Sequence, residues 1–158
     1  MRIAVILHNI RSLHNVGSIF RTSDGAGAEK LYLCGITPSP VDRFGNIRKE
    51  VAKVALGAER TVPWEYAART VPLLARLARE GWHLLAVEQY PHADNLWSAL
   101  PRLRRKKKIA VILGEEVRGL PVALLRRVNQ IMEIPMYGKK ESLNVSVAAG
   151  IALFTLRS

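Results

Sequence analysis

Residues 134–148 read Ile134-Pro135-Met136-Tyr137-Gly138-Lys139-Lys140-Glu141-Ser142-Leu143-Asn144-Val145-Ser146-Val147-Ala148. An apolar start, a polar loop and a long apolar run follow one another. This order predicts a strand over 131–134, a loop over 135–142 and a helix over 143–156. Ser142 or Asn144 would cap the helix, because either side chain can accept a hydrogen bond from a free helix amide. The helix is apolar almost all round, so we expect it to be buried on several sides, partly by a second subunit.

Short apolar runs and helical patterns alternate along the rest of the chain. The apolar runs predict four further strands, over 3–7, 31–34, 83–87 and 109–113. Helical patterns predict a helix from about residue 16 with Asn15 as its N-cap, and others over 48–56, 71–80 and 121–127. The alternation predicts one α/β domain over 1–158, with a mostly parallel sheet and helices on both faces.

The chain is strongly basic. Its 158 residues contain 24 Lys and Arg against 13 Asp and Glu, which gives a formal net charge of +11. Such an excess points to a polyanionic partner, most often nucleic acid, although an anionic membrane surface or mere solubility would also fit. No apolar run has the length of a membrane span, and no signal-peptide pattern precedes the first strand. We therefore expect a cytoplasmic protein without membrane contact.

Cysteine, histidine and glycine patterns argue against several common sites. Cys34 is the only cysteine and follows the apolar residues 31–33, so we expect a core thiol. The four histidines show no metal-ligand spacing with Cys34 or with carboxylates, so no metal is expected. No serine sits in a nucleophile elbow. The glycine spacings of a phosphate loop and of a dinucleotide fingerprint are both absent.

Three polar loops follow predicted strands, over 8–15, 114–120 and 135–142. Ligands of open α/β sheets sit beyond the carboxyl ends of strands, so these loops are candidates for one site. Arg11 and Arg21 bracket a helix start in the first loop, which favours phosphate binding.

The second and third loops have several interpretations. Glu115 or Glu116 would bind a cation or a hydroxyl group, or would simply pair with Arg118. The lysine pair of the third loop would meet phosphate or remain solvated. A basic run also precedes the strand at 109–113, and it reads Arg102-Leu103-Arg104-Arg105-Lys106-Lys107-Lys108. With this net charge, a patch that contacts phosphate is about as well supported as a solvated loop.

Taken together, the three loops resemble the SpoU/TrmH family of the SPOUT RNA methyltransferases, over nearly the whole chain. The three motifs read Asn15-Val16-Gly17-Ser18-Ile19-Phe20-Arg21-Thr22, then Ile112-Leu113-Gly114-Glu115-Glu116-Val117-Arg118-Gly119-Leu120, then Ile134-Pro135-Met136 with Ser142-Leu143-Asn144-Val145-Ser146-Val147-Ala148. The resemblance implies a deep trefoil knot at the C-terminus and a homodimer. It also implies methyl transfer from S-adenosylmethionine, without a metal, to a ribose 2′-hydroxyl of RNA.

The resemblance assigns roles to particular residues. Arg21 would activate the 2′-hydroxyl with help from an RNA phosphate, and Asn15 would position Arg21 or the substrate. Glu116, Ser142 and Asn144 would orient the substrate and the polar end of the donor. Backbone groups near six residues would hold the donor: Leu113, Gly114, Ile134, Met136, Ser142 and Leu143. RNA contacts would come from Arg11, Arg21, Arg104, Arg105, Lys106 and Lys107.

The nature of the RNA is less constrained. No extension precedes the first strand, so we expect the domain and its dimer to select the RNA themselves. We favour tRNA over ribosomal RNA. Two rival interpretations are a non-catalytic RNA-binding module on the same fold and an unrelated α/β nucleotide-binding enzyme.

Overall fold

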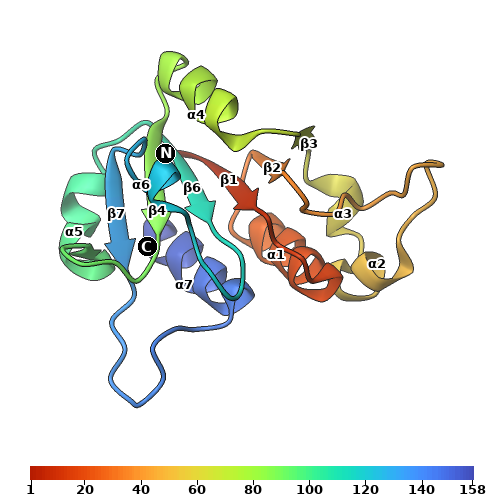
Figure 1. Cartoon of the computed structure of the whole chain (residues 1–158). Coiled ribbons are helices and arrows are strands. Elements are labelled where there is room, and N and C mark those ends of the chain that lie inside the picture. The colour runs from red at the N-terminus through yellow and green to blue at the C-terminus, as the bar shows by residue number, and fades with distance from the viewer.

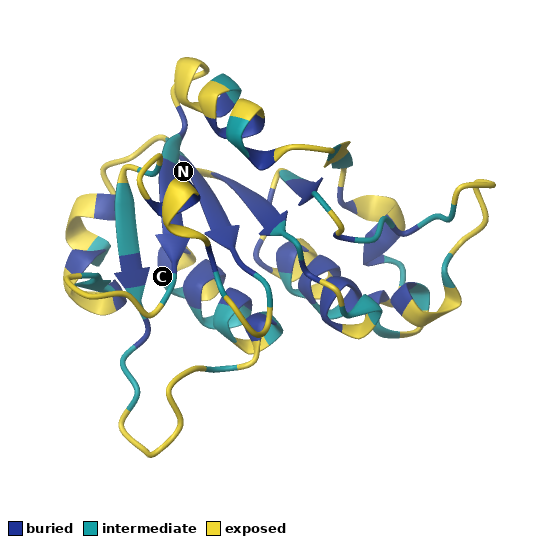
Figure 2. Cartoon of the chain, viewed as in Figure 1, coloured by how far each residue is buried: buried dark blue, intermediate teal, exposed yellow.

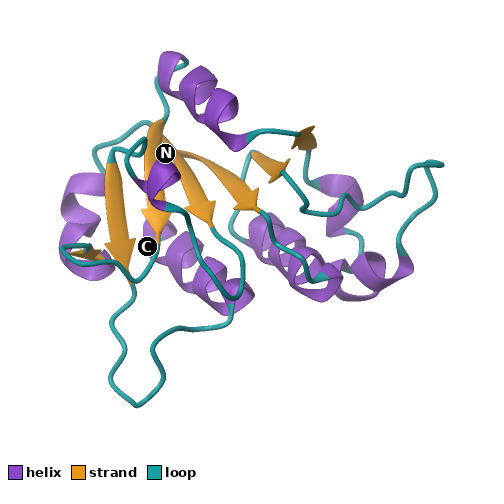
Figure 3. Cartoon of the chain, viewed as in Figure 1, coloured by secondary structure: helices purple, strands orange, loops and turns teal.

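A seven-stranded sheet forms the centre of the computed structural model, which describes all 158 residues (Figures 1 and 3). The strands lie in the order β3-β2-β1-β6-β4-β7-β5, and every neighbouring pair is parallel. Their bounds are β1 (Arg2–His8), β2 (Lys30–Cys34), β3 (Trp64–Ala67), β4 (His83–Val87), β5 (Asp94–Asn95), β6 (Lys108–Leu113) and β7 (Gln130–Glu133). The prediction of a mostly parallel sheet is confirmed.

Helices cover both faces of the sheet. They are α1 (Leu13–Gly25), α2 (Lys49–Ala55), α3 (Ala58–Thr61), α4 (Thr70–Arg79), α5 (Leu96–Leu103), α6 (Val122–Leu125) and α7 (Val145–Arg157). Strand side chains alternate between faces. Ile3, Val5 and Leu7 therefore join the core under α1, α2, α5 and α7, whereas Ala4 and Ile6 join the core under α4 and α6. Figure 2 shows the central strands as the most deeply buried part of the chain. None of the helices has both the length and the apolar character that crossing a membrane requires.

The predicted strands match the observed ones to within one residue at each end, but two strands were not expected. β3 is a four-residue edge strand that contains Glu65, and β5 has only two residues. Neither presents an apolar run. Pairing with a neighbouring strand holds each in the sheet, β3 beside β2 and β5 beside β7.

The predicted start of the first helix was wrong. α1 begins at Leu13 with Ser12 as its N-cap, and the Ser12 hydroxyl accepts a hydrogen bond from the Asn15 amide at 3.1 Å. Asn15 lies inside the helix, where its side chain is buried and bonded elsewhere. At the last helix, Asn144 rather than Ser142 is the N-cap.

Candidate functional site

A cavity of about 500 Å³ lies at the carboxyl ends of strands β4, β6 and β7. Its walls come from the end of β4, the loop after β6, and the segment that leads into α7; these are residues 87–89, 113–119 and 141–145, together with Ile134 and Ala148. The chain runs outward from β1 to β2 and β3 on one side, and β6, β4, β7 and β5 lie on the other. The cavity is thus close to the point where the strand order reverses, and its size is that of a small-molecule site.

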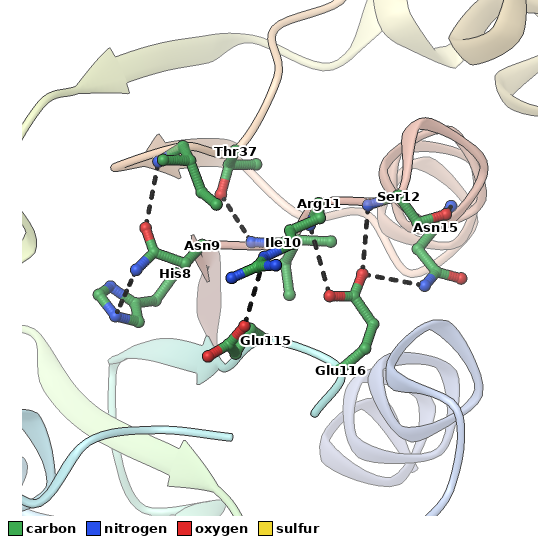
Figure 4. A network of polar contacts seen from close by, with 10 residues as sticks. His8, Asn9, Ile10, Arg11, Ser12, Asn15, Thr37, Glu115 and Glu116 are labelled. Carbon is green, nitrogen blue, oxygen red and sulfur yellow. Dashed lines mark hydrogen bonds and ion pairs between the residues drawn. The ribbon is translucent and has the colours of Figure 1, made fainter. Parts of the chain in front are cut away.

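Glu116 connects the loop after β6 to the start of α1 (Figure 4). Its carboxylate accepts hydrogen bonds from the Ser12 amide at 3.3 Å and from Asn15 Nδ2 at 3.2 Å, with a longer contact to the Arg11 amide at 3.4 Å. The amides are free because they precede the first turn of α1. A carboxylate at this position therefore fixes the loop and the helix to one another.

Asn15 connects the same network to the third loop. While Asn15 Nδ2 donates to Glu116, Asn15 Oδ1 accepts from Asn144 Nδ2 at 3.2 Å. Asn144 in turn caps α7, where its Oδ1 accepts from the Ser146 amide at 2.9 Å. The side chains of Asn15 and Asn144 each donate through Nδ2 and accept through Oδ1. An ionised carboxylate cannot donate, and a hydroxyl has only one atom for both roles. Three loops far apart in the sequence are thereby joined by two asparagines and one glutamate.

The Glu116 carboxylate is ionised at neutral pH. Burial raises the pKa of Glu116, but hydrogen bonds from its own amide, from Asn15, and from the Ser12 and Arg11 amides outweigh burial and leave the pKa below its ordinary value. Glu115 forms an ion pair with Arg11, at 3.5 Å between Oε2 and Nε. Glu115 thus pairs with an arginine of the first loop, rather than with Arg118.

Most of the residues predicted to bind the cofactor line the cavity: Leu113, Gly114, Ile134, Ser142 and Leu143. Met136 does not. Gly114 permits the loop to fold back closely, since a Cβ there would lie 2.5 Å from the carbonyl carbon of Gly119. Glu116, Ser142 and Asn144 also line the cavity, and Asn15 reaches it through hydrogen bonds.

Arg11 pairs with Glu115 of the cavity wall, whereas the other predicted cationic residues lie elsewhere. Arg21 is exposed on α1 and does not line the cavity of its own chain. Arg104, Arg105, Lys106 and Lys107 are exposed before β6, at the opposite end of that six-residue strand from the cavity. At about 3.3 Å per residue, the strand separates the basic run from the cavity by roughly 20 Å. An RNA held by both would have to extend across the molecule.

Two residues of the cavity wall were missed in the sequence. Glu88 Oε2 accepts a hydrogen bond from the Leu120 amide at 2.7 Å, and Gln89 Nε2 donates to the Ile134 carbonyl at 2.7 Å. These side chains hold the loop after β6 and the end of β7. They follow a buried strand directly, so the rule that singled out the other three loops would have found them.

A second set of polar contacts joins Thr70, at the start of α4, to His8 and Cys34. The Thr70 hydroxyl lies 2.7 Å from His8 Nδ1, and burial lowers the pKa of His8, with Glu115 partly opposing that effect. Burial raises the pKa of the Cys34 thiol to about 11, although a hydrogen bond with Thr70 acts in the other direction. The prediction that Cys34 is a core thiol is confirmed.

Comparison with known proteins gives a consistent result. The sequence profile of the SpoU rRNA Methylase family matches residues 2–154. The 23S rRNA (guanosine-2′-O-)-methyltransferase of Ralstonia nicotianae is 34% identical over 150 residues, which are 95% of this chain and 56% of that protein. The chain thus spans little more than half the length of such curated relatives.

Two solved structures are informative. The AdoMet-bound rRNA methyltransferase of Sinorhizobium meliloti has a TM-score of 0.87 and 28% identity, over 99% of this chain and 56% of that chain. A structure that concerns the 2-OH methylation of C/U34 on tRNA has a TM-score of 0.80 and 25% identity, over 99% of this chain and 94% of that chain.

Proposed function

Since the chain belongs to the SpoU rRNA Methylase family, we propose that it transfers a methyl group from S-adenosylmethionine to a ribose 2′-hydroxyl of RNA. One observation carries the proposal: Asn15 bonds both Glu116 and Asn144, two residues that line a cavity of about 500 Å³. A protein that only binds RNA needs neither the cavity nor this network. The non-catalytic interpretation is therefore less well supported.

The chemistry of the cavity fits the proposed donor. Four glutamates and one arginine line it, although the chain as a whole carries a net charge of +11. An acidic lining suits the sulfonium and ammonium groups of S-adenosylmethionine and opposes a phosphorylated nucleotide. Apolar side chains such as Leu113, Ile134 and Leu143 offer a surface for the adenine ring. When bound, the donor supplies an electrophilic methyl group.

The residues of the site would serve the acceptor in different ways. A ribose hydroxyl is a poor nucleophile, and it needs a proton acceptor or electrostatic help. The ionised Glu116 would hold Asn15, and through it Asn144, in a fixed orientation at the cavity. An arginine remains protonated, so Arg21 would act by holding an RNA phosphate beside the hydroxyl instead of acting alone as a base. Because Arg21 lies outside its own cavity, this role requires a second subunit.

A stripe of apolar side chains on α7 supports a homodimer. Val147 and Phe154 are 49% and 52% exposed, and Ile151 lies between them on the same helix face. α1 packs beside α7, with Thr22 next to Gly150 and Gly25 next to Phe154. Arg21 lies one turn before Gly25 on α1, and therefore on the side of that helix near Phe154. We propose that a second subunit covers the stripe and that each Arg21 completes the partner's cavity.

We further propose the deep trefoil knot at the C-terminus. Its support is that residues 141–145 and the loop at 113–119 form walls of one cavity. In Figure 1 the segment that leads into α7 passes the loop after β6. Threading of the C-terminal segment through this loop would keep the two walls together. The knot would thus account for a site built from segments that are distant in the sequence.

The RNA has two candidates. The 34% identity to a 23S rRNA methyltransferase favours ribosomal RNA. The structure concerned with C/U34 of tRNA favours tRNA, because the likeness extends over 94% of that chain. Our expectation of tRNA stays a prediction, and we place the protein in the cytoplasm with either RNA.

Calorimetry and methyl transfer test the proposal together. We expect one S-adenosylmethionine or S-adenosylhomocysteine site per subunit. Arg21→Ala should abolish methylation of a competent RNA and leave donor binding largely intact, because Arg21 lies outside the cavity of its own chain. Absence of donor binding would contradict the proposed methyltransferase activity. Preferential binding of a phosphorylated nucleotide would support the rival interpretation, an unrelated α/β nucleotide-binding enzyme.

A further inference from the structure

A projecting segment between β2 and α2 presents an aromatic ring to solvent. The segment, residues 38–48, is called the arm here, and it extends away from the sheet beyond α2 and α3 (Figure 1). Phe44 at its tip is 73% exposed. Burial in the protein's own core does not account for an aromatic side chain at this position.

The arm is held in a defined turn. Asp42 Oδ1 accepts hydrogen bonds from the Phe44 amide at 2.8 Å and the Asn46 amide at 2.9 Å. The Asp42 amide donates to the Asn46 carbonyl at 2.8 Å, and Val41 pairs with Ile47 in an antiparallel bridge. A turn closed in this way holds Phe44 in position before any partner binds, which reduces the entropy lost on binding.

One cation lies beside the exposed ring, and others follow it in the sequence. The Arg43 guanidinium lies 4.7 Å from the centroid of the Phe44 ring. Arg48, Lys49 and Lys53 follow within and just after the arm. An aromatic face with adjacent cations is the combination that binds unpaired nucleotides, because the ring stacks on a base while the cations meet phosphate. Contact between the arms of two subunits would instead bring like charges together.

The base of the arm is attached to the candidate site (Figure 4). Thr37 Oγ1 accepts from the Ile10 amide at 3.1 Å and donates to the Leu7 carbonyl at 3.0 Å. Asn9 Oδ1 accepts from the Ile36 amide at 3.1 Å. The next residues of that loop donate their amides to Glu116. The residues just before the arm are therefore hydrogen-bonded to the loop after β1, whose Arg11 and Ser12 amides bind Glu116.

We propose that the arm is a second RNA-contact site, in which Phe44 stacks on an unpaired base and Arg43 binds a phosphate next to it. The inference rests on the proposed RNA substrate and makes it more specific. It requires an acceptor RNA with an unpaired nucleotide outside the cavity, on the side of β2. The arm would then select RNA by shape before the target ribose enters the site.

Fluorescence anisotropy with a labelled, unstructured RNA of about 12 nucleotides tests the arm, and a duplex of the same length serves as comparison. Wild type should prefer the single strand. Phe44→Ala should weaken single-strand binding at least about fivefold, whereas Phe44→Trp should retain it. Trp97→Ala is the matched control, since Trp97 is 47% exposed on α5, and it should leave the affinity unchanged.

Salt dependence separates the two contacts. Arg43→Gln should lower the slope of log affinity against log salt by about 0.7, the value for one phosphate on a single strand, and Phe44→Ala should not change it. Equal affinity of Phe44→Ala and wild type, or no binding of the single strand by wild type, would overturn the proposal. So would a loss of dimer in Phe44→Ala by light scattering.

Donor binding by the same variants distinguishes this failure from failure of the proposed function. If wild type binds no S-adenosylmethionine while Phe44→Ala weakens RNA binding, the proposed methyl transfer is contradicted and the proposed RNA contact by the arm is supported. If wild type binds the donor and Phe44→Ala leaves the RNA affinity unchanged, only the proposed RNA contact by the arm is contradicted.

Discussion

Asn15 shows most clearly how one side chain serves this site. It is 6% exposed, and its amide donates to Glu116 and accepts from Asn144. Buried polar groups that lose a partner cost free energy, so the three residues depend on one another. Their positions after strands and at a helix start predicted that they belong to one site. Their bonding could not be predicted, because Ser12 and Asn15 are both good N-caps and only the contact with Glu116 separates their roles.

The acid stability of the protein should depend on Glu116. Its pKa is lowered in the folded state, so the unfolded chain binds its proton first as the pH falls. The stability that the carboxylate contributes is therefore present above its unfolded pKa, about 4.3, and is lost as the pH falls through the folded pKa. Melting temperatures of wild type and Glu116→Gln, measured from about pH 7 to about pH 3, should converge at the acid end. Parallel curves over this range would show that Glu116 has no lowered pKa.

At the level of helices and strands, sequence periodicity predicted the elements with strong apolar patterns. The strands of the sheet centre are buried on both faces, so their apolar runs are distinct. β3 and β5 depend on pairing with their neighbours, and that contact leaves no local pattern. The packing of α1 against α2 could not be predicted from the sequence either. A small residue such as Gly17 indicates only that a backbone or a ligand can come close to α1 at that position.

Gly17→Ala should destabilise the contact between α1 and α2. A Cβ at Gly17 would lie 2.6 Å from the Val51 carbonyl oxygen and 3.2 Å from Val54 Cβ, and the first of these is backbone. Overpacking of this kind costs about 1–3 kcal/mol. Gly150→Ala is the matched control, because its nearest neighbour is Thr22 Cγ2 at 3.7 Å. Alanine favours a helix over glycine by about 1 kcal/mol, so the control should melt higher than wild type. Equal melting temperatures for both variants would contradict the close approach.

For the molecule as a whole, the distribution of charge and apolar surface explains why a second subunit is expected. The net charge is +11, yet the cavity wall is acidic, and Arg21 lies outside it on α1, the helix that packs against α7. Composition predicted the polyanionic partner. It could not predict that the basic run before β6 lies at the amino ends of the strands, at the opposite end of β6 from the cavity. That position follows from the strand directions.

Subunit mixing tests whether Arg21 acts on the partner's cavity. Arg21→Ala and Asn144→Ala proteins should each be inactive, since one lacks the proposed arginine and the other a residue of the cavity network. A heterodimer would contain one site with both residues intact, so an equal mixture should recover about a quarter of wild-type sites. The same mixture with Phe154→Asp in both chains should recover nothing, because the stripe is interrupted. Absence of recovery in the first mixture, with subunit exchange shown by mass spectrometry, would show that Arg21 does not act on the partner's cavity.

The most direct test of ribose methylation uses S-adenosylmethionine with a deuterated methyl group. The protein is incubated with unmodified tRNA and, separately, with ribosomal RNA, and the nucleosides are analysed by mass spectrometry after digestion. We expect the labelled methyl group on a ribose 2′-oxygen of one of these RNAs, and none with Arg21→Ala. A label on a base, or no label in either RNA despite donor binding, would contradict ribose 2′-hydroxyl methylation by this chain.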